Sequence, residues 1–376
     1  MKRFWKFFLL VGLIMAYSVP VLAVDVKFSG AYYAQGWYIN NHELQDDNDS
    51  NAFINQRLRI GLFDVGYQQS SSPFGTGFLD SDESVGRIKY TLPVCFGPCT
   101  IVLSYEKLKE DTPDNNRDAD NSAYSVAGIW KLQKGETGII YKYLDIADSR
   151  PAGVKTSLHV LSPYVKTVVG PVNVEAEAYY IDGKAMAIEA SLAGPGVDAE
   201  SYGGYVKVEL PQAPASFGAI LAYMKGDNQG TTDKMEGGFM SYLHWGENFN
   251  PCLILWNYDY NHDWVGPLAG NATTNPTSGY MDNVLFAQLY AGLNLNPKTK
   301  LKASLAYAKA DKKPLGFVDV EYGTELDITA SYKIYNNLEY MIGAAYLWAG
   351  DYFKGTNPNY HIDDNYLLMH KLTLTF

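Results

Sequence analysis

The residues of this chain that could act on a solute are charged side chains that alternate with apolar ones. In the run QRLRIGL, Arg57 and Arg59 alternate with leucine and isoleucine, and in VGRIKYTL, Arg87 and Lys89 do the same. Fixed charges of this kind attract ions and orient polar solutes without making or breaking covalent bonds. The pattern therefore predicts that these side chains act on ions and polar solutes through their charge.

Carboxylates follow the same pattern further along the chain. VNVEAEA places Glu175 and Glu177 on one face of an extended segment, and ELDITASYK places Glu325, Asp327 and Lys333 on one face. If such a face met lipid at mid-depth, each charge would cost about 2–4 kcal/mol. We therefore expect a polar interior lined by the charged members of these runs, Arg57, Arg59, Arg87, Lys89, Glu175, Glu177, Glu325, Asp327 and Lys333.

Catalytic and metal-binding patterns are weak in this sequence. Neither G-x-S-x-G nor HExxH occurs, and the histidines are scattered, so we expect no enzyme. DNDSNA (47–52) begins like a calcium loop, but Ala52 stands where Gly is needed and Leu58 where the bidentate Glu belongs. We expect no metal site and no cofactor, although calcium bridging between acidic loops and lipopolysaccharide stays open.

The elements that position these charges are expected to be strands. Hydrophobic residues make up 47% of the chain, yet after Ala23 no uncharged apolar run approaches the roughly 18 residues of a transmembrane helix. A chain of this kind can cross a membrane only with strands that form a closed barrel. The 30 Tyr and 7 Trp suit the aromatic girdles of such a barrel, or a tyrosine-rich secreted all-β protein.

Short turns and longer polar connections alternate along the chain, which predicts one domain, residues 24–376, folded as an all-β transmembrane antiparallel β-barrel with short periplasmic turns and longer external loops. We expect about sixteen strands, with about eighteen as the alternative if residues 52–67 and a further partner also span. The expected turns lie at 95–99, 132–137, 169–171, 210–215, 246–251, 296–299 and 335–337. No connection looks long enough for a plug domain, but residues 181–201 could fold inward as a constriction or remain an ordinary external loop.

The two ends of the chain indicate export. Lys2, Arg3 and Lys6 precede the apolar stretch FFLLVGLIMAY and a small residue, Ala23, so residues 1–23 are expected to be a secretory signal peptide. The last residues, NYLLMHKLTLTF, alternate as a strand and end on Phe376. That C-terminal aromatic resembles the sorting signal of Gram-negative outer-membrane barrels, and its deletion is expected to lower the amount of assembled protein.

With these features the mature chain resembles a Gram-negative outer-membrane porin. The resemblance implies an outer-membrane location, contact with membrane lipid and lipopolysaccharide, a homotrimer, and passive diffusion of small hydrophilic solutes and ions through a water-filled channel. It also implies a basic wall, here Arg57, Arg59, Arg87 and Lys89, set against acidic residues such as Glu175 and Glu177. A barrel with a structural or interaction role, as a sheath for a trans-envelope partner or an adhesive surface, is the alternative.

The charge balance and the cysteines add two expectations. Without the three basic residues of the signal peptide, 27 Lys and Arg remain against 41 Asp and Glu, a net charge of −14. This argues against nucleic acid as a partner, and acidic loops at a pore mouth predict weak cation selectivity. Cys95 and Cys99 flank a turn in an oxidising compartment, which favours a disulfide instead of a metal-binding pair. Cys252 would then remain without a disulfide partner.

Overall fold

The computed structural model describes residues 29–40, 50–61, 65–81, 83–93, 99–110, 119–189, 194–271 and 277–375, and side chains from Gln69 onward. The expected signal peptide, Cys95 and Phe376 lie outside these ranges, as do the side chains of Arg57 and Arg59. Cys99 opens a strand and is partly exposed, and its disulfide with Cys95 stays a prediction.

Antiparallel strands form most of the regular structure of the described residues. Apart from the two-residue β12 (Lys234–Met235), they are β1 (Ser29–Asn40), β2 (Ser50–Gly61), β3 (Val65–Gln69), β4 (Ser84–Pro93), β5 (Cys99–Lys109), β6 (Asn121–Leu132), β7 (Gly135–Ile146), β8 (Val154–Val169), β9 (Val172–Ile188), β10 (Val197–Gln212), β11 (Ala215–Met224), β13 (Val284–Asn296), β14 (Thr299–Lys309), β15 (Glu321–Tyr335), β16 (Leu338–Ala349) and β17 (Asn365–Thr375). The expected all-β class is confirmed.

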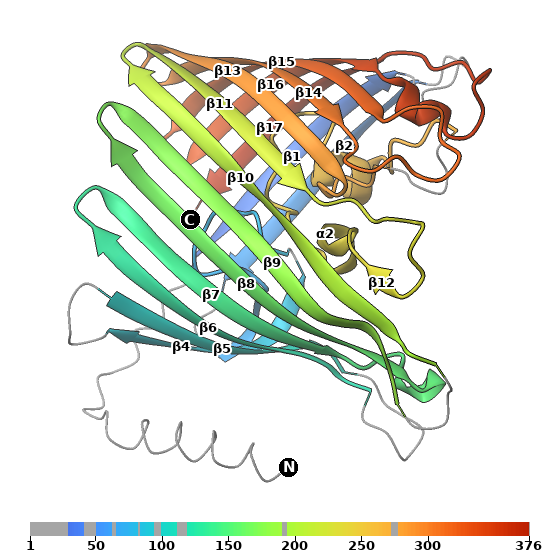
Figure 1. Ribbon diagram of the computed structural model, residues 1–376. Helices are drawn as coiled ribbons and strands as arrows, with labels where there is room; N and C mark the ends of the chain where they lie inside the picture. The colour runs from blue at the N-terminus through green and yellow to red at the C-terminus, as the bar shows by residue number, and fades with distance from the viewer. Residues whose placement is uncertain are drawn as a thin grey trace.

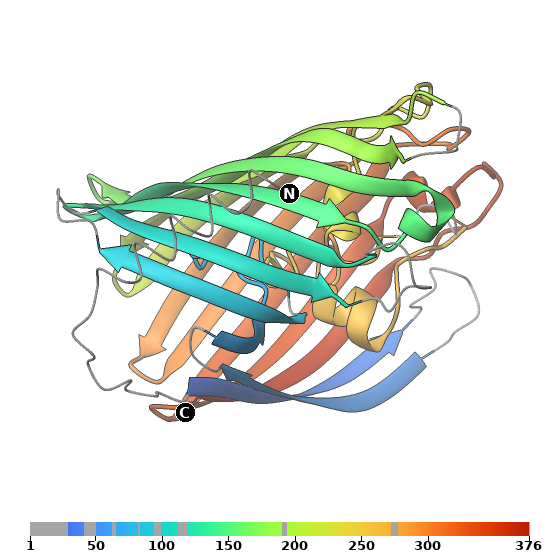
Figure 2. The same cartoon turned by 90° about the horizontal axis from the view of Figure 1, so that it is seen from below.

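The strands form one sheet that curves around an interior, as Figures 1 and 2 show. From β3 to β17 the long strands pair with their neighbours in sequence, and β11 pairs directly with β13. The last strand then pairs with the first from Ala31–Thr375 to Asn40–Tyr366, and β1 pairs with β2. In the described residues, β2 pairs residue by residue with β1 and β3 with β4, but β2 has no such register with β3, so full closure of the barrel stays a prediction.

Turns and loops sort to opposite edges of the sheet. Two-residue turns join β6 to β7, β8 to β9, β10 to β11, β13 to β14 and β15 to β16 at one edge, which we call the turn end. The longer connections lie at the other edge, the loop end, and include the 3-10 helices η1 (Arg150–Ala152) and η3 (Asp351–Lys354). The described residues of the range 181–201 do not form a constriction, because 181–188 continue β9 and 197–201 begin β10.

Two segments that the sequence pattern did not separate fold into the interior. The long inward segment, residues 225–271 and 277–283, contains β12, α2 (Phe239–Tyr242) and the π-helix η2 (Asp259–Trp264), and Figure 1 shows α2 within the curve of the sheet. The short inward segment, residues 70–81 and 83, precedes β4. The expected turn at 246–251 is therefore wrong: it lies inside the long segment, where Cys252, Ile254, Leu255 and Trp256 are all buried without alternation.

The wall exposes large apolar side chains on its outer face, while its inner face carries polar side chains together with buried apolar ones. On β13, Gln288 is 1% exposed, whereas its neighbour Leu289 is 67% exposed. Val284, Phe286 and Tyr290 share the inner face with Gln288 and pack in the main hydrophobic cluster. This interior is filled at mid-depth by the long inward segment, whose Trp256 and Tyr260 belong to the same cluster. Within the described residues, no helix combines the length and apolar character needed to cross a membrane.

Candidate functional site

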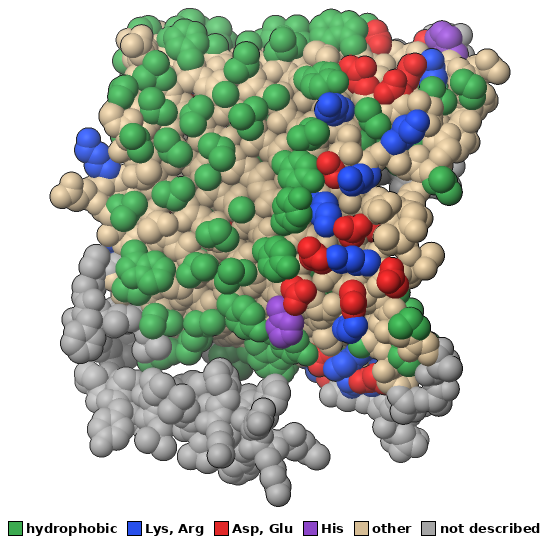
Figure 3. Space-filling view, in the orientation of Figure 1, with side chains coloured by type: hydrophobic (Ala, Val, Ile, Leu, Met, Phe, Trp, Pro, Cys, Tyr) green, Lys and Arg blue, Asp and Glu red, His purple; other side chains and the backbone are tan. Residues whose placement is uncertain are grey.

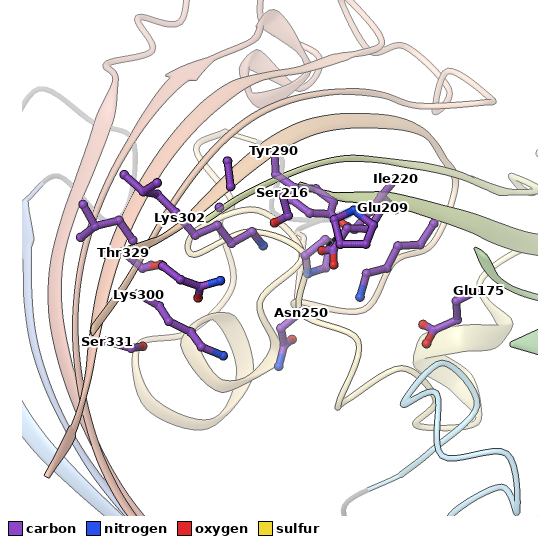
Figure 4. Close-up of a pocket in the computed structure, with 18 of the residues that line it drawn as sticks. Glu175, Glu209, Ser216, Ile220, Asn250, Tyr290, Lys300, Lys302, Thr329 and Ser331 are labelled. Atoms are coloured by element: carbon purple, nitrogen blue, oxygen red, sulfur yellow. Dashed lines mark hydrogen bonds between the residues drawn. The ribbon is translucent and has the colours of Figure 1, made fainter. Parts of the chain in front are cut away.

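A polar cavity of about 640 Å³ lies in the interior toward the turn end. Its wall comes from β9, β10, β11, β13, β14 and β15, and its floor is the stretch from Asn248 to Pro251 of the long inward segment. Figure 4 shows side chains of these strands pointing into the space from opposite sides. We call it the turn-side cavity.

Three lysines face this cavity. Lys207 stands on β10, and Lys300 and Lys302 stand on β14 at alternate positions, which places both on the inner face. The Lys302 ammonium lies 4.8 Å from the centroid of the Tyr290 ring, a cation–π contact. None of the three forms an ion pair with a described residue, so their ammonium groups can interact with a solute or ion in the cavity.

The carboxylates of the cavity are held by tyrosine hydroxyls. Tyr205 donates a hydrogen bond of 2.8 Å to Glu175, and Tyr290 donates one of 3.3 Å to Glu209. Lys166 lies 3.7 Å from the second oxygen of Glu175. Because Lys207 and Glu209 stand two residues apart on β10, both signs of charge face the same cavity.

Arg87 does not line open water. Its Nε lies 3.2 Å from Glu106, which also pairs with Lys142 at 3.1 Å, and all three side chains are largely buried. The Arg87 guanidinium further donates to the backbone carbonyls of Gln69 and Ser71. This cation therefore fixes the start of the short inward segment instead of forming an exposed basic wall.

Glu177 is likewise covered by the short inward segment. Its carboxylate accepts hydrogen bonds from Thr76 of that segment and from Ser162 of β8, the latter at 3.0 Å. Gly77 follows Thr76 with φ +79°, and a Cβ there would lie 2.8 Å from the carbonyl oxygen of Asn248. The two inward segments thus touch at a point where only glycine fits.

Glu325 and Asp327 point inward but lie beneath the long inward segment. Both oxygens of Glu325 accept backbone N–H groups, from Leu253 and Ile254 on Oε1 and from Leu255 on Oε2. Asp327 accepts a hydrogen bond of 3.2 Å from Ser304. Both carboxylates are buried against this segment, and their lining of an aqueous space stays a prediction.

The predicted site residues are therefore not brought together as one constriction. Glu175 borders the turn-side cavity, Lys89 is half-buried on the same strand face as Arg87, and Lys333 is half-buried on the inner face of β15. The role of these residues in lining a pore stays a prediction. Sequence reasoning missed Glu106, Lys142, Lys207, Lys300 and Lys302. Of these, Lys142, Lys207 and Lys302 have apolar or aromatic neighbours on both sides, so the period-two argument could have found them.

Toward the loop end, an ion pair joins the two inward segments. His244 Nδ1 lies 2.9 Å from the Glu83 carboxylate. The hydrogen bond to Glu83 raises the pKa of His244, and the same bond lowers the pKa of Glu83. Ser81 and Tyr280 both donate to the buried carboxylate of Glu247, at 3.2 and 2.8 Å.

A second cavity, of about 390 Å³, borders the long inward segment near the loop end. Trp256, Tyr280 and Asp282 line part of it. Burial raises the pKa of Asp282, although the backbone N–H groups of Met240 and Ser241 donate to its carboxylate at 3.0 and 2.7 Å. Asp282 thus anchors the start of α2 beside this second cavity.

The outer surface carries a row of aromatic side chains near the loop end. Tyr105, Tyr124 and Tyr143 pair directly across β5, β6 and β7, and His159 of β8 follows in register. Their ring centroids are 5.1–6.4 Å apart. In Figure 3 hydrophobic side chains cover the outer face, and a band of charged ones runs along its loop end; ion pairs there include Lys155–Asp145, Lys107–Asp120, Lys184–Asp198 and Lys234–Glu200.

Comparison with known proteins gives matches of shape only. The sequence matches no family model and no curated protein. Among solved structures, it is similar to the outer-membrane expressed OmpT of Vibrio cholerae, at 10% identity over 95% of this chain and 100% of that one, with a TM-score of 0.45. OprD and OccK5 (OpdH) of Pseudomonas aeruginosa match at 10% and 12% identity over 93% of this chain and 94% and 98% of theirs, both with TM-scores of 0.47. At this level the matched structures assign neither substrate nor residues to this chain.

Proposed function

We propose that this chain is an outer-membrane channel for passive diffusion of small hydrophilic solutes and ions. The observation that carries the proposal is the inverted wall: side chains such as Leu289 face outward, while Gln288, Lys302 and Glu209 face inward. If water lay on both sides of the wall, such an apolar outer surface would be unfavourable, since a soluble protein buries its large aliphatic side chains. The surface is favourable if lipid lies outside the wall and water inside it.

The aromatic row and the charged band support a membrane boundary at the loop end. Tyrosine rings are favoured where hydrocarbon meets headgroups, and charged side chains are tolerated only beyond that level. Tyr335 and Tyr340 beside the opposite turn, both exposed, suit the second boundary. On this placement the turn end faces the periplasm, and the loop end faces outward toward lipopolysaccharide.

The turn-side cavity supports selection by charge within this channel. Lys207, Lys300 and Lys302 act on anions, whereas the acidic loops concentrate cations at the mouth. We keep weak cation selectivity as the proposal, because the mature chain carries a net charge of −14 and the lysines are opposed by Glu175 and Glu209.

Single-channel recording of the purified, refolded chain in planar bilayers tests this function. Discrete conductance steps with a small cation preference in a salt gradient are expected. Chemical cross-linking in detergent tests the homotrimer that the porin resemblance implies. A folded protein that passes no current would refute the channel and favour the alternative role, a sheath or an adhesive barrel whose interior stays filled by the long inward segment.

A further inference from the structure

Behind the turn-side cavity, three side chains that can bind metal meet in the buried interior. Cys252 begins the buried stretch of the long inward segment, and Glu325 and Asp327 stand two residues apart on the inner face of β15. One ligand atom from each lies within 4.8 Å of the other two. Cys252 is 2% exposed, Glu325 is 0% exposed and Asp327 is 4% exposed.

Two buried oxygens at this cluster have no hydrogen-bond donor among the described residues. One is Oδ1 of Asp327, whose other oxygen accepts from Ser304. The other is Oε1 of Gln288, whose amide nitrogen donates to the Pro251 carbonyl at 2.7 Å and lies 3.6 Å from the Cys252 sulfur. A buried acceptor without a partner is unfavourable, and a cation bound between the three ligands would satisfy Oδ1 of Asp327.

We propose that Cys252, Asp327 and Glu325 bind one divalent metal ion of the zinc type. A thiolate with carboxylate oxygens is a ligand set that Zn²⁺ accepts. Glu325 keeps lone pairs for the ion, because its Oε2 accepts only the N–H of Leu255.

The local charge suits a divalent ion. Three ionised ligands together with the nearby Lys302 ammonium give a net charge of −2, which a divalent cation neutralises in a buried site. Binding of the ion would displace the proton of the Cys252 thiol, because a thiol binds zinc as the thiolate. Pro251 and Lys302 line the turn-side cavity, which offers the ion a route from water.

The competing arrangement holds protons in place of the ion. A neutral Cys252 thiol and a carboxyl group that shares one proton between Glu325 and Asp327 would also satisfy the cluster. The two arrangements differ in metal content, which can be measured directly and independently of conductance.

The test refolds the full chain with Zn²⁺ or Co²⁺, removes excess metal, and measures bound metal by mass spectrometry. We expect about one ion per folded chain and a thiolate-to-cobalt absorption band. Cys252→Ser and Asp327→Asn should lose the band and the stoichiometric metal, whereas Cys99→Ser should keep both. Heat-modifiable gel migration checks that each variant is folded.

Three outcomes would overturn the proposal. They are a folded wild type without stoichiometric metal, metal retained in full by folded Cys252→Ser, and an equal loss in Cys99→Ser. The first of these is the result expected of the proton-sharing arrangement. A channel that conducts normally with an empty cluster would leave the proposed function standing while refuting the metal site.

Discussion

Glu325 of β15 accepts a hydrogen bond of 2.6 Å from the backbone N–H of Leu255, so one wall carboxylate is joined to the main chain of the long inward segment. Leu253 and Ile254 donate to the same carboxylate at 3.0 and 2.7 Å. A carboxylate that accepts several backbone N–H groups is a strong anchor, because each bond is charge-assisted. This single side chain is therefore a strong anchor of the segment in the lumen.

Replacing Glu325 should loosen the segment. Glu325→Gln keeps the size of the side chain but removes the charge and one acceptor, so we expect larger and noisier single-channel currents than in the wild type. Glu321→Gln, at the exposed start of the same strand, is the matched control and should give single-channel currents like those of the wild type. Identical traces for Glu325→Gln and wild type would show that the segment is held by its apolar packing alone.

The contact between the two inward segments should depend on Gly77. Gly77→Ala brings a methyl group against the Asn248 carbonyl and strains a positive φ, whereas Gly75→Ala strains a similar φ of +60° in open space. We expect Gly75→Ala to cost about 1 kcal/mol of unfolding free energy and Gly77→Ala clearly more. Urea unfolding in detergent measures both, and equal losses would argue against the contact.

The lysines of the turn-side cavity should oppose cation flow. Removing the charges of Lys300 and Lys302 by substitution with Gln should strengthen cation preference, seen as a larger reversal potential in a salt gradient. The effect should shrink at high salt, where screening shortens to about 3 Å at 1 M. Lys298→Gln, at the exposed tip of the turn after β13, should change the potential less. A reversal potential that is unmoved by the double substitution would place the conducting path elsewhere.

The ion pair between Glu83 and His244 should give the inward segments a pH dependence. The pKa of His244 is raised above its usual 6.5, so its contribution is complete below 6.5 and is lost as pH rises through the raised value. The pKa of Glu83 is lowered below 4.5, so its contribution is present above 4.5 and is lost as pH falls through the lowered value. The pair is thus strongest between these limits.

Conductance recorded across this range tests the pair. Channel noise in the wild type should be lowest at mildly acidic pH and should increase at alkaline pH. His244→Gln should flatten that profile, whereas His361→Gln, in the exposed connection before β17, should leave it intact. A His244→Gln channel with an unchanged pH profile would rule out this ion pair as the source.

The sequence alone was sufficient for the strand wall. A period of two in segments such as 172–188 and 284–296 determines both the strand and the face of each side chain, because a strand alternates regardless of its neighbours. The sites of the two-residue turns followed from local Gly, Pro and Asn content. The inward direction of Glu175, Glu177, Glu325 and Asp327 came from the same rule.

Only the tertiary structure decided what those inward side chains meet. Residues 225–283 have no period that distinguishes a surface loop from a segment folded into the lumen, and their burial depends on contacts with strands far away in sequence. Arg87 and Glu106 are 19 residues apart, and Cys252 and Glu325 are 73 apart, so no local pattern could pair them. Alternation assigns a side chain to a face, whereas the arrangement of the whole sheet decides whether that face meets water or protein.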